Sequence, residues 1–488
     1  MSPKLLLFIF LAYTIVLFLI TWLTAKKANN ESFYIGNKSS PWYVVAYGMI
    51  GASLSGVTFM SVPGWVGSTQ FTYMMVVFGY LIGYAVIALV LMPLYYRLNL
   101  TTIYTYLSKR FGFWSYKTGA FFFLLSRIIG ASFRMFLVVN VLQIFVFDAW
   151  GIPFGLTVGI FISLIILYTF KGGIKTIIWT DTLQTTFMLA AVVVTIVLIS
   201  KGLNFSFAGL ITTVIHSDYS KVIDSDWHSK QFFLKQIFSG AFITIAMTGL
   251  DQEMMQKNLS CRNLRDAQKN MFSFSFILIF INIMFMFLGA VLFMYASKEG
   301  FHLPVRSDDL FPVISLKYLS PIAGLMFMIG LISAAYPSAD GALTALTTSF
   351  SIDFLGLDKK TALTEKQKTR IRYMVHIAFA IILLTVIVIF RAINDRAVID
   401  KLFTIAGYTY GPLLGLFAFG LFSKKQLKDR WVPFVAIISP VICYFLSEYS
   451  VQLFNGYKFG FELLIMNGLI TYFGLFLIQR KENALVVE

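Results

Sequence analysis

The chain has 488 residues, of which 58% are hydrophobic and 13% are charged, and its formal net charge is +16. With a mean hydropathy of +0.78, this composition excludes a soluble globular protein and is typical of membrane proteins with many spans. The basic excess would suggest nucleic-acid binding in a soluble protein, but here the basic residues lie between apolar segments, which indicates membrane topology and no nucleic-acid role.

Thirteen apolar segments are each long enough to cross a bilayer, which takes about 20 residues. In chain order they cover residues 4–24, 42–67, 72–96, 118–147, 153–170, 177–200, 233–256, 270–296, 321–353, 374–391, 401–422, 431–450 and 461–479. The first is not a cleaved signal, because its charges, Lys26 and Lys27, follow it where a signal carries them in front. We therefore predict an all-α polytopic membrane protein with a single transmembrane domain over residues 1–488.

The second segment contains a break. Residues 48–67 carry five glycines, three serines, a threonine and a proline within an apolar stretch. In hydrocarbon an unpaired backbone group costs several kcal/mol, so irregular backbone survives only where it is buried in protein or lines a polar cavity. The freed carbonyls and hydroxyls of such a broken helix can bind a small cation or polar solute, as in many secondary transporters.

The seventh segment, 233–256, is the second atypical one. Its apolar run is interrupted by Gly240, Thr244, Thr248, Gly249 and Asp251. Broken helices at corresponding positions of two repeats indicate a central site in an inverted-repeat transporter. Glycine and serine also serve plain helix packing in membranes, which is the alternative.

These two broken segments divide the chain. We expect a first repeat over 42–200 and a second over 233–422, with an extra N-terminal helix at 4–24 and two C-terminal helices within 431–479. If the N-terminus is outside, 25 of the 39 basic residues fall in inner loops and 11 in outer segments. The positive-inside rule then predicts a multi-pass protein of the cell membrane with its N-terminus outside and its C-terminus cytoplasmic.

Five stretches carry a family resemblance. They are ASLSGVTFMSVPG at 52–64, GGIKTIIWTDTLQ at 172–184, GLDQEMMQKNLSCRN at 249–263, ISAAYPSADGALTALTTSFSIDFL at 332–355 and YTYGPLLGLFAFG at 408–420. With them the chain resembles the sodium:solute symporter family, which includes sodium/glucose, proline and sialic acid symporters. The resemblance implies thirteen helices with a leucine-transporter-like 5+5 inverted repeat, and Na⁺ entry coupled to solute uptake by alternating access.

The resemblance also implies a principal Na⁺ site. Its ligands would be the carbonyls of Gly51, Leu54 and Ala334 and the hydroxyl of Ser338. Na⁺ is a hard cation that prefers such oxygens. Pro337 stands where the family usually has serine; it removes a hydroxyl but frees the carbonyl four residues earlier, which could replace the ligand or simply mark a kink.

Asp181 matches an acidic residue that lines an additional Na⁺ site in some members. Its partners there are serines, but this chain has Asp340 and Gly341 at those positions. Two facing carboxylates would share a cation or hold a proton, so Asp181 and Asp340 are further candidate ion ligands. Alternatively, Asp181 caps the start of a helix.

Arg127 and Arg134 lie seven residues apart in one segment and hence on nearly one helix face. Buried arginine needs an anionic partner. In the sialic acid branch of the family an arginine on this helix binds the substrate carboxylate, and Arg134 is the better match. The alternative is an internal ion pair of Arg134 with a carboxylate such as Asp251.

The other candidate solute ligands are Ser53, Ser55, Thr58, Tyr73 and Gln252. The three hydroxyl positions resemble the sialic acid branch, although Val77 stands where relatives use glutamine or glutamate. We expect a Na⁺-driven importer of a small polar solute from the class of sialic acids, sugar acids and sugars, with no obligate protein partner. A proton-coupled transporter, favoured by the two aspartates, and a non-transporting sensor are the alternatives. No nucleophile or metal constellation indicates an enzyme.

Overall fold

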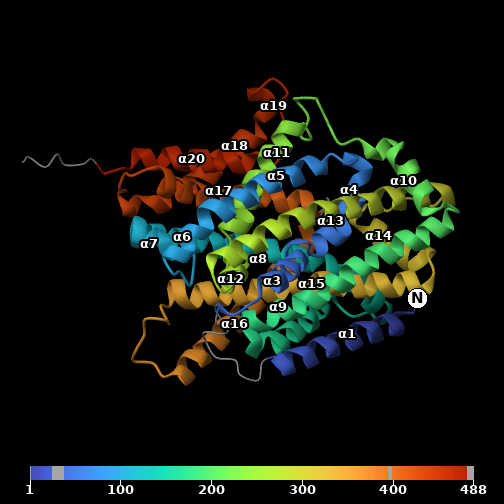
Figure 1. Cartoon of the computed structure of the whole chain (residues 1–488), viewed down its shortest axis with the longest axis horizontal. Helices are drawn as coiled ribbons and strands as arrows, with labels where there is room; N and C mark the ends of the chain where they lie inside the picture. Colours follow the sequence, from blue (N-terminus) through green and yellow to red (C-terminus); the bar gives the residue numbers. More distant parts are fainter. Residues whose placement is uncertain (1, 25–37, 394–397, 481–488) are drawn as a thin grey trace, which may run out of the picture.

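A computed structural model describes residues 2–24, 38–393 and 398–480, and these residues form helices and connections with no β-strand. Most helices run along one common direction (Figure 1). Helix α1 lies along the outside of the bundle next to α9 and α15, while α18 and α20 pack with α17 on the opposite side.

The helices are, in chain order, α1 (Pro3–Thr24), α3 (Trp42–Ser53), α4 (Gly56–Thr69), α5 (Tyr73–Val86), η2 (Ile87–Leu91), α6 (Met92–Arg97), α7 (Thr105–Arg110), α8 (Phe113–Leu142), η3 (Gln143–Phe147), η4 (Asp148–Trp150), α9 (Phe154–Gly202), α10 (Phe207–Ile215), η5 (Asp218–Ser220), α11 (Phe233–Thr244), η6 (Ile245–Gly249), α12 (Gln252–Leu259), α13 (Leu264–Glu299), η7 (Ser307–Asp309), α14 (Leu310–Val313), η8 (Ile314–Tyr318), α15 (Pro321–Ser349), η9 (Phe350–Phe354), α16 (Glu365–Ile393), α17 (Val398–Phe422), η10 (Asp429–Trp431), α18 (Val432–Glu448), α19 (Ser450–Leu453) and α20 (Leu463–Leu477).

The predicted spans are confirmed. In the described part of the chain, nine helices are long and apolar enough to cross a membrane, and two bent pairs add two more spans. Two shorter apolar helices, Phe154–Leu167 and Leu463–Leu477, occupy the remaining predicted segments.

Helix α9 covers two predicted spans and doubles back. The Phe161 ring lies 5.7 Å from that of Tyr336, while a side chain on Gly330 would touch Ala191. Thirty residues of straight helix would separate Phe161 from Ala191 by about 45 Å, yet both lie against one short stretch of α15. The two halves of α9 therefore run in opposite directions along α15.

Both predicted breaks are present. The axis bends by 56° between α3 and α4, and by 66° between the α11–η6 helix and α12. At the second break, the Asp251 carboxylate accepts hydrogen bonds from the backbone N–H groups of Glu253 (2.9 Å) and Met254 (3.3 Å). Asp251 is therefore the N-cap of α12 and satisfies donors that the break would otherwise leave unpaired.

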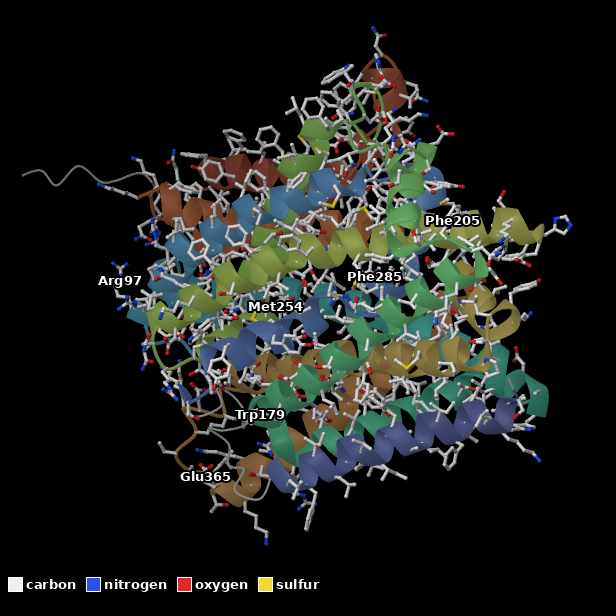
Figure 2. The ribbon with its side chains drawn as sticks, turned by 45° about the vertical axis from the view of Figure 1, so that its right-hand side comes forward. Arg97, Trp179, Phe205, Met254, Phe285 and Glu365 are labelled. Carbon is white, nitrogen blue, oxygen red and sulfur yellow. The ribbon has the colours of Figure 1, made fainter. Side chains whose placement is uncertain are left out.

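The two ends of the bundle differ in charge. Arg97 and Glu365 lie toward one end and Phe205 toward the other, with Met254 and Phe285 between them (Figure 2). We call the first end, where α6 meets α7 and α16 begins, the basic end. Its basic residues include Arg97, Lys109, Arg110, Lys366 and Lys368.

Candidate functional site

A cavity of about 80 Å³ lies where the two breaks meet. Its walls come from α3, α4, α5, α8, the α11–η6 helix, α12, α13 and α17. The lining residues are Ala52, Ser53, Leu54, Ser55, Val57, Thr58, Tyr73, Tyr80, Tyr84, Arg127, Arg134, Ile243, Thr244, Met247, Thr248, Met254, Leu278, Asn282, Ile399, Leu402 and Phe403. The site thus forms where irregular backbone and hydroxyl groups were expected to be tolerated.

Five of the six predicted solute ligands line this cavity, namely Ser53, Ser55, Thr58, Tyr73 and Arg134. Their hydroxyls and guanidinium form its polar wall.

Sequence reasoning missed two further tyrosines of α5, Tyr80 and Tyr84. The Tyr80 hydroxyl lies 2.8 Å from that of Tyr73, and the Tyr84 hydroxyl hydrogen-bonds with Ser53 and Thr248. The spacing of 73, 80 and 84 places all three rings on one helix face. That periodicity was the signal that could have identified them.

Gln252 does not reach the cavity. Its amide nitrogen donates to the Thr101 carbonyl and its amide oxygen accepts from the Ile103 N–H, both at 3.0 Å. Gln252 begins the half-helix after the break and faces the connection between α6 and α7. The structure therefore assigns it to the closure of the basic end, and the prediction of a solute ligand there is not supported.

The two arginines of α8 have different partners. Arg127 is 3% exposed and contacts both the Asp251 carboxylate, at 3.5 Å, and the Glu253 carboxylate. Among the described residues, no carboxylate oxygen lies within 4.0 Å of Arg134, and its Nε atom has no hydrogen-bond partner. Arg127 thus forms the internal ion pair that was considered for Arg134. The Arg134 guanidinium instead lines the cavity.

A charged network lies between the cavity and the basic end. It consists of Arg127, Asp181, Asp251, Glu253 and Lys257. Lys257 Nζ lies 2.7 Å from Asp181 Oδ2 and 3.8 Å from Glu253 Oε1, and Glu253 continues to Arg127 and Asp251. The Tyr410 hydroxyl donates to Asp251 Oδ2 at 2.6 Å. These contacts tie α8, α9, α12 and α17 together.

The expected pairing of Asp181 with Asp340 is wrong, because Lys257 of α12 occupies the Asp181 carboxylate. The helix-cap alternative for Asp181 is also wrong, since this residue lies inside α9. Asp340 is fully buried in α15, and neither of its carboxylate oxygens has a hydrogen-bond partner among the described residues. The described structure thus gives the Asp181 carboxylate a lysine partner and shows no hydrogen-bond partner shared by the two aspartates.

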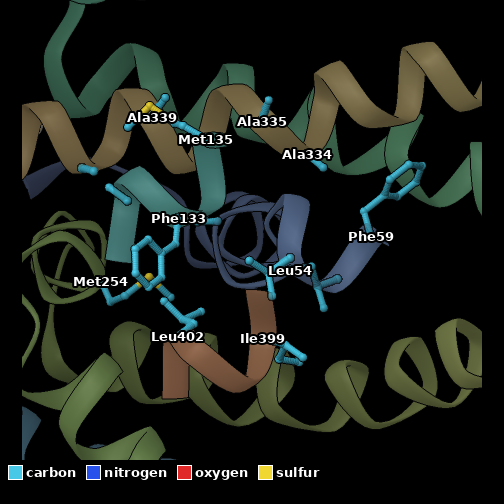
Figure 3. Close-up of a cluster of buried hydrophobic side chains, with 14 of the residues drawn as sticks. Leu54, Phe59, Phe133, Met135, Met254, Ala334, Ala335, Ala339, Ile399 and Leu402 are labelled. Carbon is cyan, nitrogen blue, oxygen red and sulfur yellow. The ribbon is translucent and has the colours of Figure 1, made fainter. Parts of the chain in front are cut away.

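The residues predicted for the principal Na⁺ site belong to α3, to the first break and to α15. Leu54 lines the cavity. In Figure 3 its side chain lies on the side of α15 that faces Met254 and Leu402, and Ala334 lies on the α15 ribbon. The Ser338 hydroxyl is 3.5 Å from the Ala334 carbonyl oxygen, a contact at the long limit of a hydrogen bond. Both oxygens therefore retain capacity for another partner, and this neutral donor set fits Na⁺. Gly51 packs against Thr185 of α9.

An aromatic lid covers the cavity on the side away from the basic end. It consists of Trp65, Tyr73, Phe403 and Phe461. Trp65 lies 5.9 Å from Tyr73 and 6.0 Å from Phe461, and Phe403 lies 4.8 Å from Phe461, measured between ring centroids. Trp65 and Phe461 also border a second hollow of about 280 Å³ beyond the lid. Aromatic rings thus lie on one side of the central cavity and the charged network on the other.

Comparison with known proteins shows which family this chain belongs to and which proteins it resembles. Residues 33–429 match the model of the Sodium:solute symporter family. The chain is 24% identical over 448 residues to the sodium/sialic acid symporter SiaT of Proteus mirabilis, covering 90% of this chain and 88% of the relative. It is 23% identical over 443 residues to the sodium-coupled monocarboxylate transporter 1 of Xenopus laevis, covering 88% and 67%.

Solved structures show the same fold. A Na⁺-coupled sialic acid symporter in a substrate-bound outward-open state superposes with a TM-score of 0.79 at 19% identity, over 97% of this chain and 98% of that one. Mhp1, a nucleobase-cation-symport-1 family transporter, superposes in a closed conformation with a TM-score of 0.55 at 12% identity, over 92% and 93%. The expected leucine-transporter-like architecture is confirmed.

Proposed function

Because this chain belongs to the sodium:solute symporter family, we propose that it uses Na⁺ entry to import a small organic anion whose carboxylate binds Arg134. The observation that carries this assignment is the Arg134 guanidinium, which lines the cavity without a carboxylate partner in the described structure. A planar guanidinium binds a carboxylate through two parallel hydrogen bonds. An arginine left without an anion inside a membrane protein is costly, so a bound carboxylate would offset that cost.

Sialic acids and related sugar acids are the proposed solutes. Ser53, Ser55 and Thr58 present hydroxyls to the same cavity as Arg134, which suits a polyhydroxylated solute. The Tyr73 ring offers a face on which a sugar could stack. The relatives named for sialic acid support this class.

Cavity size favours a second candidate, a short monocarboxylate. The cavity measures about 80 Å³, whereas sites for larger organic ligands usually occupy about 300–1,000 Å³. A sugar acid therefore requires the aromatic lid or the cavity walls to move outward. A two- or three-carbon acid makes a smaller demand, and a relative named for monocarboxylates supports it.

The proposed Na⁺ site uses the carbonyls of Gly51, Leu54 and Ala334 and the Ser338 hydroxyl. One Na⁺ entering down 100 mV contributes about 2.3 kcal/mol, and a tenfold gradient adds about 1.4 kcal/mol. For a neutral solute this sum supports roughly several-hundred-fold accumulation per Na⁺. An anion carried with one Na⁺ forms a complex without net charge, which gains nothing from the membrane potential, so one Na⁺ supports roughly tenfold accumulation of the anion and each further Na⁺ adds the full sum.

Alternating access is proposed to use the two closures around the cavity. Opening the aromatic lid separates mainly ring contacts of Trp65 and Phe461, whereas opening toward the basic end requires the charged network to rearrange. We place the basic end in the cytoplasm, because most loop lysines and arginines gather at that end, and we place the N-terminus outside. The repeats are proposed to cover 42–200 and 233–422, each beginning with a bent helix pair.

Uptake into proteoliposomes tests the function. With an imposed Na⁺ gradient and no pH gradient, labelled sialic acid or lactate should accumulate, and collapsing the Na⁺ gradient should abolish accumulation. A sugar acid should compete with uptake far better than its amide. Accumulation under a pH gradient alone would contradict Na⁺ coupling, and equal competition by acid and amide would contradict the carboxylate anchor.

A further inference from the structure

We propose that the Lys257 ammonium is a tethered cation that fills a second cation position, between α9 and α12, and so lowers the number of Na⁺ ions carried per solute by one. This inference rests on the proposed Na⁺ coupling and deepens it. The position is separate from the ligands proposed for the coupling ion, because Lys257 contacts acidic side chains rather than the Ala334 and Ser338 oxygens.

The geometry places the ammonium between two carboxylates. Lys257 Nζ lies 2.7 Å from Asp181 Oδ2 and 3.8 Å from Glu253 Oε1, and all three side chains are 1% exposed. Asp181 comes from α9, whereas Glu253 and Lys257 are four residues apart on α12. The Lys257 ammonium therefore links α12, the second half of the second broken helix, to α9. Helix α9 is also the helix against which α3 packs.

Charge balance shows why this position needs a cation. The charged network holds three carboxylates, Asp181, Asp251 and Glu253, but only two cations, of which Arg127 contacts Asp251 and Glu253. In the described part of the chain, Lys257 is the single cationic group within 4.0 Å of Asp181. A carboxylate buried without a cation costs several kcal/mol. Without the ammonium, Asp181 must take up another cation or be neutralised.

The surrounding oxygens suit Na⁺. Asp181 Oδ1, Glu253 Oε1 and both amide atoms of Gln184 are buried without a hydrogen-bond partner among the described residues. Gln184 lies three residues after Asp181, on the same face of α9. Carboxylate and amide oxygens are ligands that a hard cation prefers. Removal of the ammonium would therefore leave an oxygen-lined, negatively charged position that Na⁺ can occupy.

A tethered cation has a consequence for coupling. A bound Na⁺ leaves with the solute and adds its electrochemical free energy to uptake, whereas an ammonium fixed to α12 neutralises the same carboxylates and stays in the protein. The lysine thus keeps Asp181 paired with a cation in every step. The transporter accordingly carries fewer ions than its acidic residues would bind.

Double-label flux in proteoliposomes tests this inference. The variants are Lys257→Met, which keeps the side-chain length but removes the charge, and the control Asp181→Asn/Lys257→Met, which removes both charges. The ratio of ²²Na⁺ to solute entering should rise by about one in Lys257→Met and return to the wild-type value in the double variant. A folded Lys257→Met protein with the wild-type ratio would overturn the proposal.

Thermal melting in detergent without solute provides an independent reading. Raising NaCl in place of choline chloride should stabilise Lys257→Met more steeply than the wild type or the double variant. If Lys257→Met folds poorly, NaCl should restore its yield; equal yields in both salts would refute a Na⁺-accepting position. Failure of the wild type to transport with Na⁺ would refute the proposed function, while this melting experiment would still decide the role of Lys257.

Discussion

Replacing Arg134 tests the anion site because Arg127, on the same helix, provides a matched control. Each hydrogen bond to a charged group contributes about 1.5–3 kcal/mol. Arg134 is only partly buried, so the lower value applies to each of two bonds, and Arg134→Ala should weaken solute binding by about 3 kcal/mol, or roughly 100-fold. Arg134→Lys retains a point charge without the planar fork and should lose about tenfold.

The control changes a different quantity. Arg127→Ala leaves Asp251 and Glu253 without their guanidinium and should lower the free energy of unfolding by about 3–5 kcal/mol. Arg134→Ala exposes no carboxylate and should melt near the wild-type temperature. Solute affinity would be measured by calorimetry in saturating NaCl and stability by thermal melting in detergent. A strong melting defect in Arg134→Ala with unchanged affinity would refute the anchor and indicate a structural role.

Substitutions outside the cavity test the ion site, the lid region and one buried carboxyl group. Ser338→Ala should raise the Na⁺ concentration for half-maximal uptake about tenfold, because one ligand oxygen is lost; unchanged Na⁺ dependence in an inserted protein would remove Ser338 from the site. Gly64→Ala should slow uptake at normal expression, because the added carbon would collide with the Ser307 backbone and keep α4 from closing against η7; a wild-type rate would refute that contact. Asp308, in the turn η7 outside the spans, accepts a hydrogen bond from the Val398 N–H at 3.0 Å, and burial raises its pKa to about 6. Since the folded state holds this proton more tightly than the unfolded chain, wild-type stability should fall as pH rises from about 4 to about 6. Asp308→Asn should therefore match the wild type at pH 4 and be about 2–3 kcal/mol more stable at pH 7.5, and an equal difference at both pH values would contradict this assignment.

Both broken helices were predictable from residue type alone. The first break lies at Leu54 and Ser55, inside the stretch rich in glycine and serine, whereas Pro63 is accommodated within α4. Hydrocarbon tolerates the freed backbone of such a break only at an internal polar site. Asp251 was recognisable as an interruption of the apolar segment 233–256, because a carboxylate is tolerated inside a membrane span only at an internal polar site. The spans followed from apolar length, and the central position of Ser53, Ser55 and Thr58 followed from their place in the break.

The partner of each buried charge was decided only by the tertiary structure. The spacing of Arg127 and Arg134 placed both on one face of α8, yet the first meets Asp251 and Glu253 while the second meets the cavity. Asp181 was expected to face Asp340 and instead binds Lys257. Helical periodicity sets the direction in which a side chain points from the axis of its own helix. What stands opposite depends on how neighbouring helices pack and on the 56° and 66° bends at the breaks, which no local pattern in the sequence encodes.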